Sequence, residues 1–247
     1  MARSNTTVGL LCFIISFFCP IESGQTKEMQ QFAGFKMDRT EVTIGDFRKC
    51  AVATKFISKA EIEGGGFEYG AGWERRPGLT WQPPHGVEAN DQEPAVHLNY
   101  AKAQSYCEWT GKRLPSDEEW ASAAYHEQRK EPPVSFEFGK TYDYPTGDDR
   151  IGANCLGECG PSRSVDHGIK LSRKTGHTLA GNSKAGVNGL YEMGANVWEW
   201  ILGEGEQARI KGGSWWYGTQ SMHRKHFAYK PKDFYAIYIG FRCASDL

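Results

Sequence analysis

The 247-residue chain lacks the features that mark several large classes of protein. Its 29 Lys and Arg residues nearly balance its 30 Asp and Glu residues, and the net charge of −1 gives no indication of a nucleic-acid-binding surface or of a funnel for acidic substrates. It has no internal repeat, coiled-coil heptad or dinucleotide-binding fingerprint. The glycine run at 64–66 follows charged residues and opens no helix, so it does not predict a phosphate site.

Long apolar runs are also lacking, with one exception at the N-terminus. Residues 8–19 are apolar, follow the positive charge of Arg3, and give way to Pro20. The run is too short for a comfortable membrane span and is typical of a secretory signal peptide. We expect residues 1–23 to be that signal peptide, with cleavage before Gly24.

Two alternatives remain for this segment, an uncleaved anchor and a lipoprotein attached through Cys19. Phe18 disfavours the lipoprotein, because a small residue would be wanted there. Cleavage predicts a periplasmic or secreted protein with no membrane attachment. Residues 24–31 are polar and are expected to form a flexible lead-in.

The cysteines agree with export. Five follow the signal segment, Cys50, Cys107, Cys155, Cys159 and Cys243. In an oxidising compartment disulfides are the default expectation. Cys155 and Cys159 are close enough in sequence to form a local pair.

Capping residues and spacing predict helices in the first half of the chain. Thr43 can cap a helix that has Phe47, Cys50 and Ala51 on one face. A second helix is expected from Asn99 to Gly111.

The buried stripe of that second helix is Ala103, Tyr106 and Cys107. A third helix should begin after Ser116, with Glu119 completing a capping box.

The rest of the chain predicts little regular structure. Residues 63–92 are rich in glycine, proline and aromatic residues and are expected to be irregular, and residues 130–184 are polar and turn-rich. Short strands are predicted at 208–210, 234–238 and 241–244. Early helices followed by short strands between long loops indicate an α+β fold.

The least ordinary stretch is 189–200, which holds two tryptophans, a tyrosine and two carboxylates in twelve residues. This mixture fits neither an amphipathic helix nor a simple strand. We interpret it as a rigid loop with aromatic walls, in which Glu192 and Glu199 could supply the oxygen ligands that Ca²⁺ prefers. The alternative is a buried turn with surface glutamates.

Four blocks of sequence together resemble the formylglycine-generating enzyme family, also called sulfatase-modifying factors. They are 41–43 (EVT), 94–101 (PAVHLNYA) continuing to 111–120 (GKRLPSDEEW), 189–200 (GLYEMGANVWEW), and 209–215 (RIKGGSW) with 240–243 (GFRC). The resemblance covers nearly all of the mature chain. It implies one C-type-lectin-like domain over residues 32–247, with little regular secondary structure.

The resemblance also implies a disulfide and a metal. It pairs Cys107 with Cys243, which leaves Cys50 either a buried thiol or a cysteine with an unidentified partner. It also assigns structural Ca²⁺ to a set of four residues, through two side chains and two backbone carbonyls. They are Glu192, Ala195, Val197 and Glu199.

The catalytic cysteines of the family are missing. In its oxidising members, two cysteines five residues apart follow the Gly-Gly-Ser motif, bind copper(I), and help convert a substrate cysteine into formylglycine with O₂. Aligning that motif at 212–214 puts Tyr217 and Met222 at the two positions. A phenol and a thioether cannot replace two thiolates as ligands of copper(I), so neither copper nor formylglycine generation is predicted.

The substrate groove of the family is expected to persist as a pocket with changed walls. The predicted ligand-binding residues are Trp198, Ser214, Trp215, Trp216, Tyr217, Met222 and Arg224. Such walls suit an aromatic or anionic small molecule, a peptide or a partner protein. Alternatively, Ser214 only ends a tight turn, and Trp215 and Tyr217 fill the core while Trp216 alone is exposed. A metal site begun by His223 and His226 is the weaker hypothesis, because a histidine pair in a basic run is more often at the surface.

Two classes of function follow. The first is a calcium-stabilised binding or assembly module. The second is a cysteine-independent periplasmic enzyme, similar to the family member that tautomerises a siderophore chromophore during pyoverdine maturation. The candidate catalytic residues for acid–base work are His223, Glu199 and Asp233, and Ser214 is also a candidate.

Overall fold

The computed structural model describes residues 27–69, 72–159 and 176–247, so the predicted signal peptide lies outside the described residues. The described part is a mixed α+β domain with three small sheets and long connections, as the sequence predicts. None of the helices described is long and apolar enough to cross a membrane.

The first sheet joins the two ends of the domain. Strand β2 (Phe35–Asp38) pairs with β1 (Met29–Gln31) on one side and with the C-terminal strand β9 (Ala244–Asp246) on the other. The prediction of a flexible lead-in over 24–31 is therefore wrong for residues 29–31. Their backbone groups pair with β2, and the polar side chains that suggested flexibility lie on a partly exposed edge.

The central sheet has the order β7-β6-β5-β8. It consists of β7 (Ala228–Pro231), β6 (Gln207–Lys211), β5 (Trp198–Trp200) and β8 (Ile239–Gly240). Strand β5 runs antiparallel to β6 and parallel to β8.

Sequence reasoning wrongly rejected a strand at β5, because Glu199 would share the pleat with two tryptophans. All three residues of β5 are buried, so both faces of this strand lie inside the protein. The carboxylate of Glu199 is accommodated there by an ion pair with Arg242.

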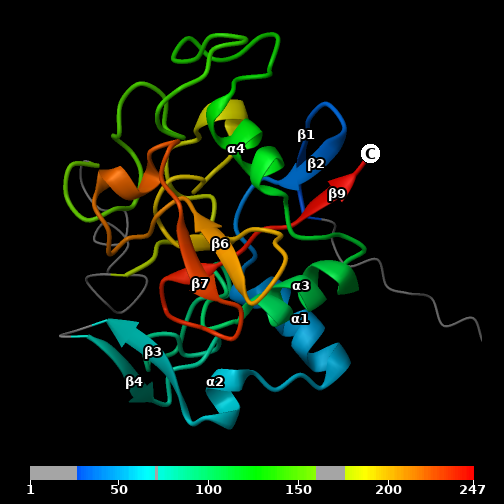
Figure 1. Ribbon diagram of the computed structural model, residues 1–247, viewed down its shortest axis with the longest axis vertical. Coiled ribbons are helices and arrows are strands. Elements are labelled where there is room, and N and C mark those ends of the chain that lie inside the picture. The colour runs from blue at the N-terminus through cyan, green and yellow to red at the C-terminus, as the bar shows by residue number, and fades with distance from the viewer. Residues whose placement is uncertain (1–26, 70–71, 160–175) are drawn as a thin grey trace, which may run out of the picture.

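A separate two-stranded hairpin forms one end of the molecule, well away from α4 (Figure 1). It consists of β3 (Gly65–Tyr69) and β4 (Trp73–Pro77), and it follows the short helix α2 (Lys59–Ile62). This segment was predicted to be irregular. A Cβ atom on Gly66 would lie 2.3 Å from Nδ1 of His97, so only glycine allows this hairpin to pack against the body.

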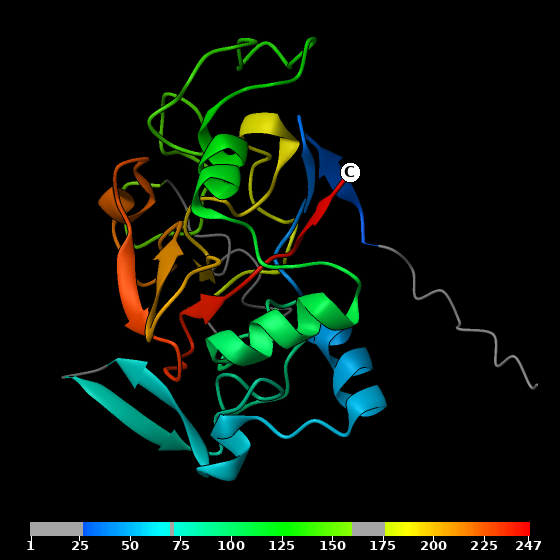
Figure 2. The same ribbon diagram turned by 45° about the vertical axis from the view of Figure 1, so that its right-hand side comes forward.

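The three longer helices begin at the predicted caps. They are α1 (Ile44–Thr54), α3 (Tyr100–Trp109) and α4 (Asp117–Tyr125), capped by Thr43, Asn99 and Ser116. Glu119 completes the capping box of α4 as predicted. Helices α1 and α3 lie together on one flank of the domain (Figure 2), and their buried faces are the predicted ones.

Two disulfides join cysteines of the described residues. Cys107 on α3 is bonded to Cys243 before β9, as the resemblance implies, and Cys155 is bonded to Cys159. Cys50 is a buried free thiol. Two short 3-10 turns, η1 (Val187–Gly189) and η2 (Thr219–Met222), lie in the connections, and the predicted strand at 234–238 is replaced by an isolated bridge at Ala236.

Candidate functional site

A tight glycine turn presents the candidate site. After β6, Gly212 and Gly213 have φ of +94° and +82°, conformations that favour glycine. A Cβ atom on Gly213 would lie 2.2 Å from Oγ of Ser221. Ser214 is fully buried in this turn, its Oγ accepts the N–H of Trp216, and its carbonyl accepts the N–H of Tyr217. These contacts favour a structural role for Ser214.

The three aromatic residues after the turn gather around Tyr238. Their ring centroids lie 5.2 Å (Trp215), 6.1 Å (Trp216) and 6.4 Å (Tyr217) from that of Tyr238. Trp198 of β5 adds a fifth ring, 5.5 Å from Tyr217. We call these five residues the Tyr238 cluster.

Exposure alternates along this cluster. Trp215 is 8% exposed and Trp216 38%, while Tyr217 is partly buried. This matches the alternative in which Trp216 is the residue that faces solvent, except that Tyr217 is only partly inside. The cluster therefore presents one exposed ring, that of Trp216, above rings that are buried or partly buried.

The tip of the β3–β4 hairpin is attached to this surface. The hydroxyl of Tyr238 accepts the N–H of Tyr69 at 3.1 Å and donates to its carbonyl at 3.3 Å. Trp73 packs edge-on against Tyr238, and Nζ of Lys230 lies 5.0 Å from the centroid of the Trp73 ring. Burial raises the pKa of Tyr238 to about 12, so its hydroxyl is protonated at physiological pH.

One buried donor in the cluster lacks a partner. The indole Nε1 of Trp215 is inaccessible to solvent and has no hydrogen-bond partner among the described residues. An unsatisfied buried donor costs about 1–3 kcal/mol of stability. Sequence reasoning selected Trp215 but gave no reason to expect an unpaired donor there.

A group of histidines lies behind Trp215 and was missed from the sequence. The ring of His85 lies 6.1 Å from Trp215 and 4.8 Å from His177. Nε2 of His177 lies 2.7 Å from a carboxylate oxygen of Glu93, and both residues are buried. His97 lies nearby, and burial lowers its pKa to about 4. These residues are far apart in the sequence, and no spacing rule would have grouped them.

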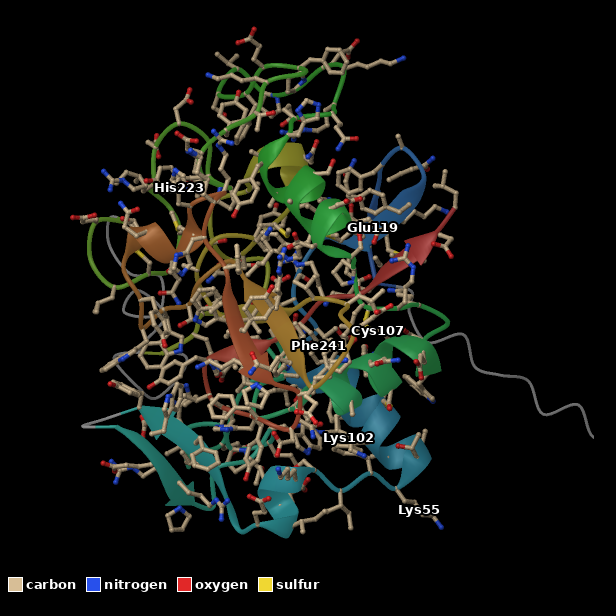
Figure 3. All side chains as sticks on the ribbon, in the orientation of Figure 1. Lys55, Lys102, Cys107, Glu119, His223 and Phe241 are labelled. Carbon is tan, nitrogen blue, oxygen red and sulfur yellow. A yellow bond between two sulfur atoms is a disulfide. The ribbon has the colours of Figure 1, made fainter. Side chains whose placement is uncertain are left out.

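His223 and Arg224 belong to a different contact network. Nε of Arg224 donates to Asp143 at 2.6 Å, and Nε2 of His223 lies 3.8 Å from the same carboxylate. Figure 3 shows His223 far from Lys102 and α3. His226, not His223, packs on Trp198, with 5.8 Å between ring centroids.

Burial lowers the pKa of His226, and His223 adds to that effect. Asp233, the other candidate for acid–base work, is an exposed residue paired with Lys59 at 3.0 Å.

Met222 does not line the aromatic surface, which corrects its assignment to ligand binding. It is fully buried against the Cys155–Cys159 disulfide and Ala195, in a cluster separate from that of Trp215. The position of the family's second catalytic cysteine is thus filled by a packed thioether. The backbone at this position lies in η2, and the hydroxyl of Tyr125 donates to the Met222 carbonyl at 3.2 Å.

The two side chains assigned to calcium accept hydrogen bonds from other groups of the protein. Both oxygens of Glu199 accept hydrogen bonds from Arg242, and one also accepts from Nε1 of Trp120 at 2.7 Å. The oxygens of Glu192 accept the backbone N–H groups of residues 181–183. A cation at these side chains would have to displace those donors, so the two carboxylates do not fit Ca²⁺ in this conformation.

Arg242 supplies the positive charge in this buried region. Burial opposes its charged form, but Glu199, and next Glu41, raise the pKa of the guanidinium. Glu41 is fully buried, and burial, with the nearby charges of Glu192 and Glu199, raises its pKa well above the usual range. Among the described residues, no group of three or more His, Cys, Asp or Glu side chains is placed to hold a metal ion.

Asn196 fixes the loop that precedes Glu199 and its ion pair with Arg242. Its side chain donates to Glu41 at 2.6 Å and accepts from Asn154 and from the N–H of Thr178. Its φ of +56° follows +63° at Ala195, so the chain reverses sharply before β5. The interpretation of this stretch as a rigid loop thus applies to the residues just before the strand.

Short strands, long connections and a C-terminal disulfide define a C-type-lectin-like α+β domain. The family model of the sulfatase-modifying factor enzyme 1-like domain matches residues 20–247, and the chain belongs to this family. It is 26% identical over 253 residues to the inactive C-alpha-formylglycine-generating enzyme 2 of Bos taurus, covering 85% of this chain and 77% of that protein.

Relatives named formylglycine-generating enzymes are equally similar. The formylglycine-generating enzyme of Thermomonospora curvata is 26% identical over 265 residues, covering 86% of this chain and 82% of that protein. Among solved structures, PvdO from Pseudomonas aeruginosa has a TM-score of 0.58 and 20% identity, covering 86% of this chain and 80% of that one. That likeness establishes the fold, and the site residues must decide the function.

Proposed function

We propose that this protein is a binding member of its family, which holds a small aromatic or anionic molecule or a peptide at the Tyr238 cluster and does not oxidise cysteine. One observation carries the proposal: a phenol at Tyr217 and a fully buried thioether at Met222 stand at the two thiol positions. The exposed ring of Trp216 supports ligand binding on the remaining surface.

The absence of oxidation is tested with a Cys-x-Pro-x-Arg peptide, copper(I) and O₂. We expect no aldehyde under conditions in which the Thermomonospora curvata relative produces it. Introducing both thiols, Tyr217→Cys with Met222→Cys, should not create activity, because position 222 points into the core. Aldehyde formation by the unaltered protein would refute this half of the proposal.

Ligand binding is tested by native mass spectrometry of protein isolated from its own host. The unaltered protein should retain a bound molecule, which Trp216→Ala should lose. Phe227→Ala is the matched control, because Phe227 is similarly exposed (42%) but packs on Tyr229. Equal retention by Trp216→Ala and the unaltered protein would contradict the assignment to the Tyr238 cluster.

We further infer export to the periplasm or beyond. The support is the apolar segment at 8–19 and two disulfides, which persist in oxidising compartments. N-terminal sequencing of the exported protein should begin at Gly24.

A second candidate function is acid–base catalysis on a small molecule, favoured by the His177–Glu93 pair beside His85 and Trp215. A buried carboxylate that orients a histidine is a common arrangement for proton transfer. If the molecule retained by the unaltered protein is chemically altered on incubation, and His85→Ala stops this while retaining binding, the enzyme assignment replaces the binding one.

A further inference from the structure

A cavity of about 370 Å³ opens between α1, the segment after it, and α3. It shares no lining residue with the Tyr238 cluster. Its volume lies within the range of small-molecule sites, which is about 300–1,000 Å³. The family resemblance assigns no role to it.

The walls of this cavity are aromatic. Phe47 packs edge-on against Phe56 at 5.2 Å between centroids and lies 5.7 Å from Tyr106. The ring of Tyr106 is followed by that of Trp109, 6.2 Å away, which is 45% exposed. A planar apolar ligand would find ring contacts on more than one side.

Two lysines also line the cavity. Nζ of Lys102 lies 4.9 Å from the centroid of the Phe56 ring, and Lys55 stands at the C-cap of α1. Figure 3 shows Lys102 on α3 and Lys55 at the end of α1, on the side of the molecule away from His223.

Within the described part of the chain, neither lysine forms an ion pair with a carboxylate. Lys49 of α1, in contrast, is 4.0 Å from Asp46. An aromatic cavity lined by two unpaired cations favours an apolar anion over a neutral or cationic ligand.

We propose that this cavity binds a small aromatic carboxylate, with its ring against the accessible side chains of Phe56 and Trp109 and its carboxylate near Lys102, where Lys55 adds positive charge at the mouth. The ring contributes burial of apolar surface, and the lysines select for the negative charge. The site is independent of the Tyr238 cluster, so this proposal and the proposed function can fail separately.

The probe is 2-naphthoate, titrated into the full chain by isothermal calorimetry. Its neutral isostere 2-naphthamide should bind about tenfold more weakly, equivalent to about 1.4 kcal/mol, because it lacks the negative charge that the lysines attract. No measurable binding of 2-naphthoate, or equal binding of the amide, would overturn the proposal.

Substitutions locate the site. Lys102→Met together with Lys55→Met should reduce the affinity for 2-naphthoate to that for the amide, whereas Lys49→Met, a matched change of charge on α1, should leave it unchanged. Ser105→Trp should fill the cavity and abolish binding, since Ser105 lines it from an exposed position on α3. Binding unaffected by Ser105→Trp in a folded variant would place the probe elsewhere.

Cys50 provides an independent readout, because this buried residue is part of the cavity lining and the cavity is the route by which a reagent would reach it. Bound 2-naphthoate should lower the rate of Cys50 alkylation by iodoacetamide. The fractional decrease in rate should be at least as large as the fraction of sites occupied. The protection should disappear in the double lysine variant at the same probe concentration. Unchanged alkylation at saturating 2-naphthoate would also overturn the proposal.

Discussion

At the scale of single residues, buried ionisable groups determine how the protein responds to pH. His97 is 1% exposed, and its Nε2 must donate to the carbonyl of Pro84 at 3.1 Å, since a carbonyl only accepts. Its other nitrogen, Nδ1, faces Gly66 and has no partner among the described residues. Protonating that nitrogen would bury an unpaired charge, and this is why burial holds the pKa of His97 near 4.

Acid should therefore destabilise the protein through His97. Its contribution to stability is fully present above the unfolded pKa of 6.5 and is lost as the pH falls through the folded pKa of about 4. The difference between the two pKa values corresponds to about 3 kcal/mol of unfolding free energy. Urea unfolding at pH 7 and pH 4 should show a much smaller loss of unfolding free energy in the His97→Asn variant. Asparagine suits this position because it tolerates the positive φ of 57°.

His126→Asn serves as the control for that experiment, because this histidine is only partly buried and bonds to Thr141 at the surface. It should keep the acid sensitivity of the unaltered protein. If His97→Asn lost as much stability as the unaltered protein between the two pH values, another group would be responsible.

At the scale of elements, the β3–β4 hairpin depends on contacts with the body because it has two strands only. Tyr238→Phe removes the hydroxyl that bonds both the N–H and the carbonyl of Tyr69. We expect faster hydrogen exchange across residues 65–77 and a loss of about 1–2 kcal/mol of stability.

Tyr229→Phe is the matched control for the hairpin, since Tyr229 is itself 50% exposed and its hydroxyl accepts from Nε of Arg209 at 2.9 Å, away from Tyr69. Exchange at 65–77 should be unchanged in that variant. If hydrogen exchange at 65–77 were the same in Tyr238→Phe as in the unaltered protein, the ring contacts of Trp73 and Phe234 would hold the hairpin without the hydroxyl.

The elements also show what the sequence could predict. Helix starts were predictable, because caps such as Ser116 with Glu119 act within four residues. The strand β5 was not, because its Glu199 is stabilised by Arg242, 43 residues later. The hairpin could not be predicted for a similar reason. Glycine is required at position 66 because the ring of His97, distant in sequence, lies where a side chain would be.

The same distinction applies to the site. Trp216 and Tyr217 were predictable because they follow a local Gly-Gly-Ser turn, but Tyr238 and His85 reach the cluster only through tertiary packing. Met222 was assigned to the ligand-binding surface by alignment alone. It is buried instead, because it packs against the Cys155–Cys159 segment.

At the scale of the whole molecule, the central question of stability is whether a metal is needed. Arg242 forms an ion pair with Glu199, which is one of the four residues that the family resemblance assigns to Ca²⁺. We therefore expect excess chelator to leave the melting temperature of the unaltered protein unchanged. A clear fall on chelation, reversed by Ca²⁺, would instead restore the calcium assignment and mean that Glu199 exchanges partners.

The disulfide between Cys107 and Cys243 also limits how far the molecule can be stretched. These residues are 136 positions apart, so a pulling force applied to the two ends bypasses the loop between them. At about 3.5 Å per residue, roughly 480 Å of contour length stays hidden while the bond is intact. In an optical trap, reduction should release that additional length, and the oxidised chain should extend mainly through the residues before α3.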